Sequence, residues 1–206
     1  MSKDPQLIDK IRDVVGLYLD PPEAAMAWTK RVRSRRWTAL RRSCRCPARL
    51  PAPRTTTSVQ APPAPLRGAE PLLRAVISSL HARHRVIEFK TFLQKIDREV
   101  PDQYAVHVVL DNASTHKTSA IKHWLLAHPR LVLHFTPTSS SWLNLVERWF
   151  GELTTKKLQR GTHRSVRDLN GDIRDWIKTW IDNPRPYVWT KTADQILDSI
   201  ARYRTN

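Results

Sequence analysis

The chain has 206 residues, with 35 Lys and Arg against 19 Asp and Glu, and a formal net charge of +16 at pH 7. This length permits one ordinary domain with a substantial core. Only two cysteines are present, which excludes a disulfide-stapled secreted fold, and no apolar run is long enough to span a bilayer. With no recognisable secretory signal, we expect an intracellular protein without a membrane partner.

The positive charge is concentrated in one stretch. Residues 24–69 hold eleven Lys and Arg and no Asp or Glu, which leaves only +5 for the rest of the chain. A basic balance normally indicates a polyanionic partner, most simply nucleic acid. The stretch is also rich in Pro, Ala, Thr and Ser and lacks an apolar period, so it can bury little surface to offset the entropy of ordering. We expect residues 29–70 to be disordered, and the functional alternative is nonspecific, salt-sensitive binding to phosphates.

Outside this stretch the hydrophobic pattern predicts alternating strands and helices. The first 23 residues predict a short helix that ends at Pro21 and Pro22. The later predicted elements are strands over 75–81, 105–110 and 131–135 and helices over 87–99, 119–127, 142–158, 166–181 and 193–203. Thr192 is a suitable N-cap for the last helix. The alternation favours a layered α/β domain.

Two carboxylates occupy positions suited to metal binding. Asp111 follows the apolar run 105–110, and Glu147 lies on the predicted helix 142–158 at the edge of its apolar stripe. Carboxylates from separate elements can hold divalent metal for phosphodiester chemistry, which uses two ions about 3.5–4 Å apart. A third carboxylate is therefore expected. The structural alternatives are a turn or helix N-cap for Asp111, which would be the commoner role for it alone, and a solvent-facing position for Glu147.

Several ordered motifs surround these carboxylates. They read Val-Leu-Asp-Asn at 109–112, His-Lys-Thr at 116–118, Phe-Thr-Pro at 135–137, Ser-Trp-Leu-Asn at 141–144 and Glu-Arg-Trp-Phe at 147–150. This set resembles the DDE transposases of bacterial insertion sequences, in the mariner-related group. The resemblance covers about residues 75–203 and the opening residues 3–23.

The resemblance implies a ribonuclease-H-like fold, in which a mixed α/β sheet is flanked by helices. It implies DNA transposition and integration of a transposable element, with DNA as partner. It also implies that Asp111 and Glu147 are two of three catalytic residues, which coordinate Mg²⁺ or Mn²⁺ in a two-metal site while water, and later a DNA 3′-hydroxyl, attacks phosphorus. The location implied is the bacterial cytoplasm, in association with the nucleoid.

Polar residues near the carboxylates are candidates for supporting roles. Asn112, His116 and Asn144 are candidates for orienting the carboxylates or contacting DNA, and turn or helix-cap hydrogen bonds are the equally weighted alternative. The candidate phosphate contacts are Lys117, Lys156 and Lys157, although such residues are ordinarily solvated surface groups. Most tryptophans are expected to be core anchors, and stacking on unpaired bases is the alternative.

The resemblance fails at the first catalytic Asp. In the family this Asp lies on a strand soon after a Pro-Pro-Glu segment, in a motif close to Val-Asp-Glu-Lys-Ser, whereas residues 24–69 contain no acid. Codons for Val-Asp-Glu-Lys-Ser-Gln-Ile-Gln-Ala-Leu-Asp-Arg-Thr can be chosen so that reading one nucleotide later gives residues 28–39 of this chain, with Thr29 at the position of the Asp. We hypothesise a frameshift, in the gene or in its sequencing, that enters near Ala25 and ends near residues 70–75.

These observations divide the chain into a helical remnant at 1–23, a basic segment at 24–70 and a DDE catalytic domain at 71–206. We expect the sheet to be incomplete, because the basic segment replaces its first strands, and we interpret the chain as truncated, without the family's upstream helix-turn-helix region. Two functions stay open. One is a metal-dependent DNA strand-cutting and strand-transfer enzyme, inactive in this copy because the first Asp is missing. The other is a noncatalytic remnant that binds DNA or pairs with an intact transposase, or with a second copy of itself.

Overall fold

The computed structural model describes residues 4–20, 25–29, 58–59, 77, 79, 85–161, 165–183, 187 and 189–202. The helices are α1 (Leu7–Leu19), α3 (Val86–Glu99), α4 (Ser119–Leu126), α5 (Leu145–Leu153), α6 (Val166–Asp182) and α7 (Ala193–Arg202). The strands are β1 (Ala25–Thr29), β2 (Ser58–Val59), β3 (Val106–Leu110) and β4 (Leu131–Phe135). Short helical turns lie at η2 (Ser114–Lys117), η3 (Ser141–Leu143) and η4 (Thr154–Leu158).

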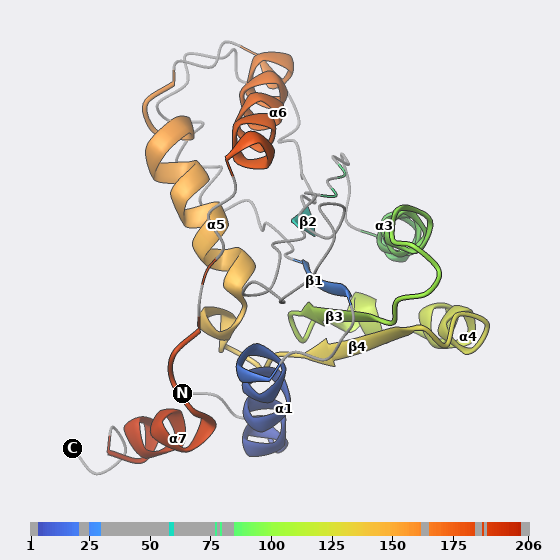
Figure 1. Ribbon diagram of the computed structural model, residues 1–206, viewed down its shortest axis with the longest axis vertical. Helices are drawn as coiled ribbons and strands as arrows, with labels where there is room; N and C mark the ends of the chain where they lie inside the picture. The colour runs from blue at the N-terminus through green and yellow to red at the C-terminus, as the bar shows by residue number, and fades with distance from the viewer. Residues whose placement is uncertain are drawn as a thin grey trace.

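A four-stranded sheet in the order β2-β1-β3-β4 forms the centre of the fold (Figure 1). Strands β1, β3 and β4 run parallel, and β2 is antiparallel to β1. Strand β3 is aligned with β4 from Val106↔Leu131 to Leu110↔Phe135 and with β1 as far as Trp28↔Val109. The carboxyl ends of β3 and β4 therefore meet at one edge of the sheet.

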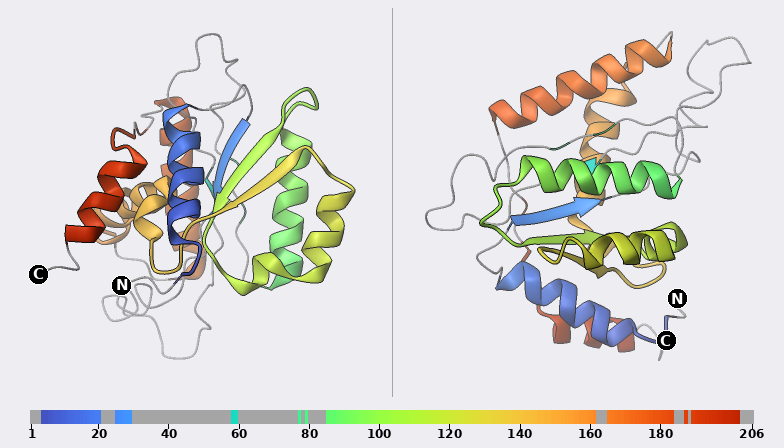
Figure 2. Two further views of the ribbon diagram at one scale, coloured as in Figure 1. Left: turned by 90° about the horizontal axis from the view of Figure 1, so that it is seen from below. Right: turned by 90° about the vertical axis from the view of Figure 1, so that its right-hand side faces the viewer.

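Helices cover both faces of the sheet, with α1 on one side and α3 and α4 on the other (Figure 2). Strand β3 accordingly carries apolar residues on both faces, with the partly buried His107 as its one polar residue. Its residues Val106, Val108 and Leu110 join a buried cluster with α3 and α4, whereas Val109 joins a different cluster with α1, α5 and α6. A strand buried on both faces is typical of parallel sheets with helices on each side.

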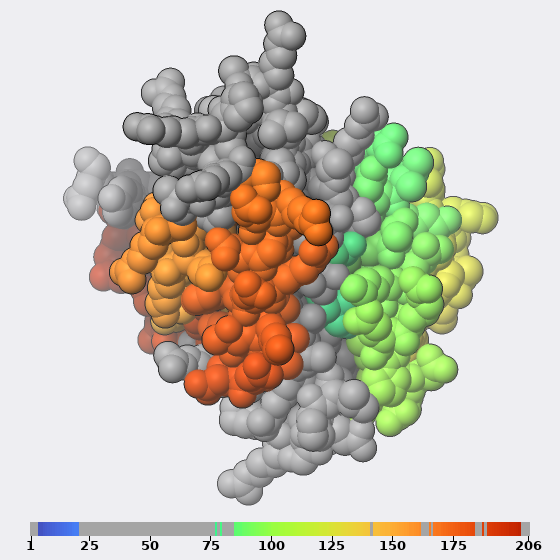
Figure 3. Space-filling model, turned by 90° about the horizontal axis from the view of Figure 1, so that it is seen from above, coloured from blue at the N-terminus to red at the C-terminus, as the bar shows by residue number. Residues whose placement is uncertain are grey.

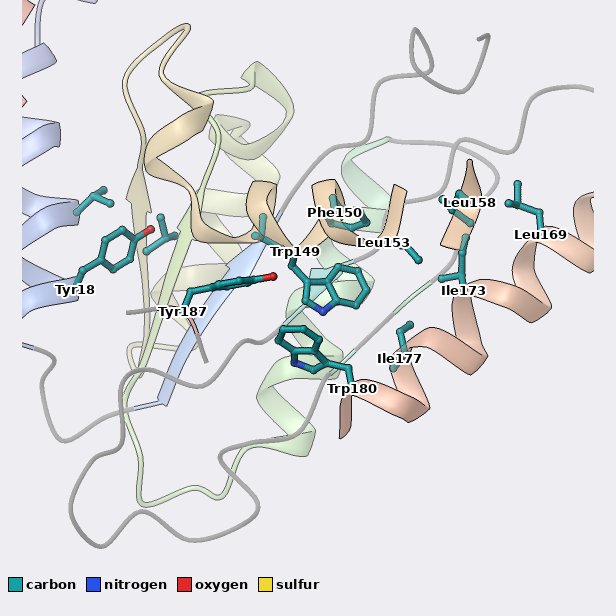
Figure 4. Packing of buried hydrophobic residues seen from close by; sticks show 13 residues of the cluster. Tyr18, Trp149, Phe150, Leu153, Leu158, Leu169, Ile173, Ile177, Trp180 and Tyr187 are labelled. Atoms are coloured by element: carbon teal, nitrogen blue, oxygen red, sulfur yellow. The ribbon is translucent and has the colours of Figure 1, made fainter. Parts of the chain in front are cut away.

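The second cluster, which we call the tryptophan cluster, consists of Val14, Tyr18, Val109, Val146, Trp149, Phe150, Leu153, Leu158, Leu169, Ile173, Ile177, Trp180 and Tyr187. Figure 4 shows Trp149 of α5 facing Trp180 of α6, with their ring centroids 6.3 Å apart at 83°. Such edge-to-face pairs add about 0.5–1.5 kcal/mol beyond area burial. Viewed from above, α6 and α5 lie on one side of the molecular surface and α3 on the other (Figure 3).

Helix α1 is part of the same core. Its Val14 and Tyr18 belong to the tryptophan cluster, and the Tyr18 hydroxyl donates a hydrogen bond of 2.8 Å to the carbonyl of Leu143. Asp13 of α1 lies 2.8 Å from Nδ1 of His134 on β4, and Nε2 of that ring lies 2.9 Å from Nδ1 of His107 on β3. Residues 4–20 thus pack into the α/β domain.

Most predicted elements are confirmed, with boundaries that shift by a residue or two. The helix expected over 142–158 is divided into η3, α5 and the π-helical turn η4, because Asn144 caps α5. No strand is present at Ile77 and Ser79, the described residues of the range 75–81.

The largest difference concerns the segment 24–70, where we expected the first strands to be missing. That expectation is wrong for β1 and β2, which both lie in this segment. Strand β1 pairs with β3, and β2 pairs with the other edge of β1. The sequence of β1, Ala-Met-Ala-Trp-Thr, precedes the basic run and is apolar enough to pair with a buried strand. Of residues 30–70, the structure describes only β2. The expected disorder and the proposed frameshift in the remainder lie outside the described residues.

Candidate nuclease site

The candidate site lies at the carboxyl edge of β3 and β4, where parallel α/β sheets place ligand sites. The loops that leave the two strands are joined there. The backbone amide of Thr136 donates a hydrogen bond of 2.8 Å to the carbonyl of Leu110, and the hydroxyl of Thr136 donates to the same oxygen at 3.3 Å. This pairing fixes the point at which Asp111 leaves the sheet.

One carboxylate oxygen of Asp111 is buried although the side chain is partly exposed. The side chain is 38% exposed, yet its Oδ1 is buried and has no hydrogen-bond partner among the described residues. Nδ1 of His116 lies 3.2 Å from this Oδ1, but it makes its hydrogen bond to the backbone carbonyl of Asp111, also at 3.2 Å. Among the described residues, the contact of this oxygen is therefore the His116 ring nitrogen at 3.2 Å.

His116 is held in place by packing. It is 6% exposed, and its ring lies 4.2 Å from the ring of Phe89 on α3. Donation to the Asp111 carbonyl requires the tautomer with hydrogen on Nδ1. The contact therefore orients the backbone of Asp111, and the predicted role of His116 in orienting the carboxylate or contacting DNA stays a prediction.

Glu147 lies in the first turn of α5, where the partial positive charge of a helix N-terminus favours a carboxylate. The preceding residue Val146 shares the tryptophan cluster with Val109, which lies two positions before Asp111. The start of α5 is thereby held on the face of the sheet at the end of β3. Asn144 is 3% exposed and accepts a hydrogen bond of 3.3 Å from the amide of Val146, so it makes the cap contact that was the structural alternative.

Asn112 and Lys117 belong to one hydrogen-bonded group. The Asn112 amide nitrogen donates to the hydroxyl of Thr138 at 2.8 Å and to Oδ2 of Asp4 at 3.2 Å, while its amide oxygen accepts from the Lys117 ammonium. That ammonium also lies 4.6 Å from the centroid of the Phe135 ring. Partial burial and then the nearby Lys10 lower the pKa of Lys117, and the Asp4 carboxylate opposes them.

The other two candidate phosphate contacts are engaged in ion pairs. Lys156 lies 2.6 Å from Glu152 on the preceding turn, and Lys157 lies 3.2 Å from Asp172 on α6. Both ammonium groups are about half exposed, so each pair is worth at most about 1 kcal/mol and can open for another anion. The pairs do not exclude phosphate binding.

The described residues do not fit a two-metal centre. They contain no group of three His, Cys, Asp or Glu side chains that could hold a metal ion. The Asp111 carboxylate is 38% exposed and could contact one cation, but a metal pair needs more negative charge than this arrangement offers. The register places Trp28 of β1 beside Val109, so β1 ends next to the end of β3, and Thr29 rather than an acid is its last residue.

Comparison with known proteins identifies one matching family. Residues 80–170 match the model of the DDE superfamily endonuclease family. The matched stretch contains both Asp111 and Glu147. No curated protein matches the chain at a significant level.

Three solved structures of Mos1 transposase share the fold. The crystal structure of the catalytic domain of the Mos1 mariner transposase has a TM-score of 0.58 and 10% identity, and the match covers 90% of this chain and 85% of that one. The same domain with raltegravir and Mn gives 0.56 and 11% identity, with 90% and 86% covered. The Mos1 strand transfer complex gives 0.53 and 12% identity, with 99% and 61% covered. The chain therefore has a mixed α/β fold that resembles the ribonuclease-H-like catalytic domain of Mos1, which is the fold that the family resemblance implied.

Sequence reasoning assigned no role to Asp4, although its side chain is 2% exposed and contacts Asn112 beside the candidate catalytic Asp111. The only sequence signal was its place in the opening segment that resembles the family.

Among the described residues, no helix is long and apolar enough to cross a membrane.

Proposed function

We propose that this chain derives from a transposase domain that cuts DNA strands and transfers them. In this copy the domain binds DNA but does not cut it. The observation that carries the proposal is the place of Asp111 directly after β3, at the carboxyl edge of the sheet, in a stretch that matches DDE endonucleases and also contains Glu147. The fold shared with the Mos1 catalytic domain supports the same lineage.

The proposed loss of cutting rests on charge. Phosphodiester cleavage by this class of site needs carboxylates that neutralise divalent ions and hold them in place. Asp111 and Glu147 supply two negative charges, and no third acid joins them among the described residues. Mg²⁺ or Mn²⁺ is thus the ion the site would take, held too weakly for catalysis.

DNA binding is the activity that remains. Lys117 beside the site, and Lys156 and Lys157 on η4, supply ammonium groups for phosphates, and the basic composition of residues 24–69 adds a sequence-independent attraction. We further propose that the chain derives from a bacterial insertion sequence, in which case it would act at the nucleoid.

The test is a plasmid-nicking assay run beside a DNA-binding assay. Wild type and Asp111→Asn are incubated with supercoiled plasmid in Mg²⁺ or Mn²⁺, and binding to a short duplex is measured over a range of salt. We expect binding that weakens steeply with salt and no metal-dependent nicking. Nicking that disappears in Asp111→Asn would show an active enzyme instead, and absence of DNA binding would refute both readings.

A restored carboxylate at the end of β1 provides the converse test. Aligned positions of neighbouring strands share a face of the sheet, so an Asp at position 28 would share the face of Val109 and α5. Position 29, to which the frameshift hypothesis assigns the lost Asp, follows position 28 in the strand, so by the alternation of side chains an Asp there would lie on the opposite face. We expect Trp28→Asp to bind Mn²⁺ more tightly than Thr29→Asp or the wild type, as measured by electron paramagnetic resonance. Equal Mn²⁺ binding by all three would contradict the proposed completion of the site.

A further inference from the structure

Asp4 carries a nearly buried carboxylate with an unusually full set of donors. Its side chain is 2% exposed, and Lys10 of α1 lies 2.8 Å from Oδ2 and 3.0 Å from Oδ1. The backbone amide of Gln6 donates to Oδ1 at 3.0 Å. These local contacts alone would describe an ordinary ion pair before a helix.

The remaining contacts reach residues that are distant in sequence. The amide of Thr138, in the loop after β4, donates to Oδ2 at 3.0 Å, and its hydroxyl lies 3.3 Å from the same oxygen. Asn112, in the loop after β3, donates to Oδ2 at 3.2 Å. One carboxylate therefore ties the start of α1 to both loops at the carboxyl edge of the sheet.

This arrangement holds only while the carboxylate is charged. Burial raises the pKa of Asp4, but hydrogen bonds from Lys10, Thr138 and Gln6 together outweigh burial and lower it to about 2. Charge-assisted hydrogen bonds are shorter and stronger than neutral ones, and several that converge on one group define its geometry closely. The donors around Asp4 are in consequence fixed relative to one another.

Asn112, held by Asp4 and Thr138, in turn positions a lysine. Its amide nitrogen is directed to Asp4 and Thr138, so its amide oxygen points away from them and accepts from the Lys117 ammonium. Lys117 is exposed, and an exposed lysine normally samples many rotamers. Here it is held between Asn112 and the ring of Phe135.

We propose that Asp4 is a positioning residue of the candidate site, which fixes Asn112 beside Asp111 and through Asn112 holds the Lys117 ammonium at the carboxyl edge of β3. Asp4 lies outside the stretch 80–170 that matches the endonuclease family. The segment before α1 is then a part of the site. The role of Lys117 as a contact for DNA phosphate rests on the proposed function, but its placement by Asp4 does not.

Lysine labelling tests the placement without DNA. Wild type, Asp4→Asn and the control Asp9→Asn, an exposed acid on the same helix, are treated with an amine-reactive reagent and the labelling rate of each lysine is read by mass spectrometry. Loss of a nearby opposite charge shifts a pKa by about one unit, which is a tenfold change in free amine. We expect Lys117 to be labelled up to about tenfold faster in Asp4→Asn, with Lys122 and the Asp9→Asn control unchanged.

A second variant covers the case in which Asp4→Asn does not fold. Asn112→Ala keeps the Asp4 charge, which by itself raises the pKa of Lys117, and removes only the acceptor that holds Lys117. Faster labelling of Lys117 in this variant therefore reports lost positioning and not lost charge. Unchanged labelling in Asn112→Ala, or in a folded Asp4→Asn, would overturn the proposal and leave Asp4 a structural ion pair.

DNA binding then separates this proposal from the proposed function. Asp4→Asn removes a negative charge, which by charge alone would strengthen binding to DNA, whereas a displaced Lys117 removes one phosphate contact. We expect weaker binding and a slope of log affinity against log salt smaller by about one. Stronger binding would refute a positioning role in DNA contact. If the variants give the expected labelling rates but the wild type does not bind DNA, the proposed function is refuted and the positioning role of Asp4 stands.

Discussion

Replacement of Asp4 by Asn should destabilise the fold in a pH-dependent manner. The change keeps the volume of the side chain and removes its charge, so Lys10 loses its partner in a position where its own side chain is only 14% exposed. The new amide group also presents donors to Asn112 and Thr138, which themselves donate to the carboxylate in the wild type.

The magnitude follows from the pKa of Asp4, which is lowered from its ordinary 3.8 to about 2. A difference of about 1.8 units corresponds to about 2.5 kcal/mol of unfolding free energy as an upper bound. The Asn side chain keeps one amide oxygen as an acceptor for these donors, so we expect a loss of about 1–2 kcal/mol. For a domain of this size that is a fall in Tm of roughly 2–8 °C.

The pH dependence has a definite sign. Because the folded-state pKa is depressed, the stabilisation by Asp4 is fully present above 3.8 and is lost as the pH falls from 3.8 through about 2. Urea unfolding, followed by tryptophan fluorescence, should show wild type more stable than Asp4→Asn near neutral pH and the difference shrinking towards pH 2. The control Asp9→Asn should match wild type. A difference between wild type and Asp4→Asn that stays constant across this range would refute the electrostatic reasoning.

Three further predictions concern packing, capping and histidine titration. Trp149→Ala should cost about 3–5 kcal/mol of unfolding free energy, because Trp149 is 0% exposed, whereas Trp142→Ala, at 49% exposed, should leave stability within about 0.5 kcal/mol in the same urea titration. Asn144→Ala should cost about 1 kcal/mol by removing the cap of α5, and Asn144→Ser should recover most of it. Burial and then the nearby His134 lower the pKa of His107 below its ordinary 6.5. The folded state therefore favours the neutral ring, and the free energy of unfolding should fall as the pH drops below 6.5, by less in His107→Gln than in wild type. An equal fall in both proteins would exclude His107 as the cause.

Local patterns in the sequence were sufficient for most elements of the core. The stripe of Phe89, Phe92, Leu93 and Ile96 has a helical period, and all four residues are buried on α3. Thr192 caps α7 as predicted, accepting from the Gln195 amide at 3.2 Å while the Gln195 side chain accepts from the Thr192 amide at 3.0 Å. Periodicity and capping involve residues within one or two turns, so the sequence alone contains them.

The sequence also determined which carboxylates are available to the candidate site. Asp111 after an apolar strand and Glu147 at the start of a helix could be selected from their immediate neighbours. The tertiary structure alone decided that β1 and β2 join the sheet, because strand pairing depends on backbone groups far apart in the chain. It likewise decided that Asp4 contacts Asn112 and Thr138, which lie 108 and 134 residues further on. No local period encodes such contacts, since they exist only after the loops of β3 and β4 have been brought to one edge of the sheet.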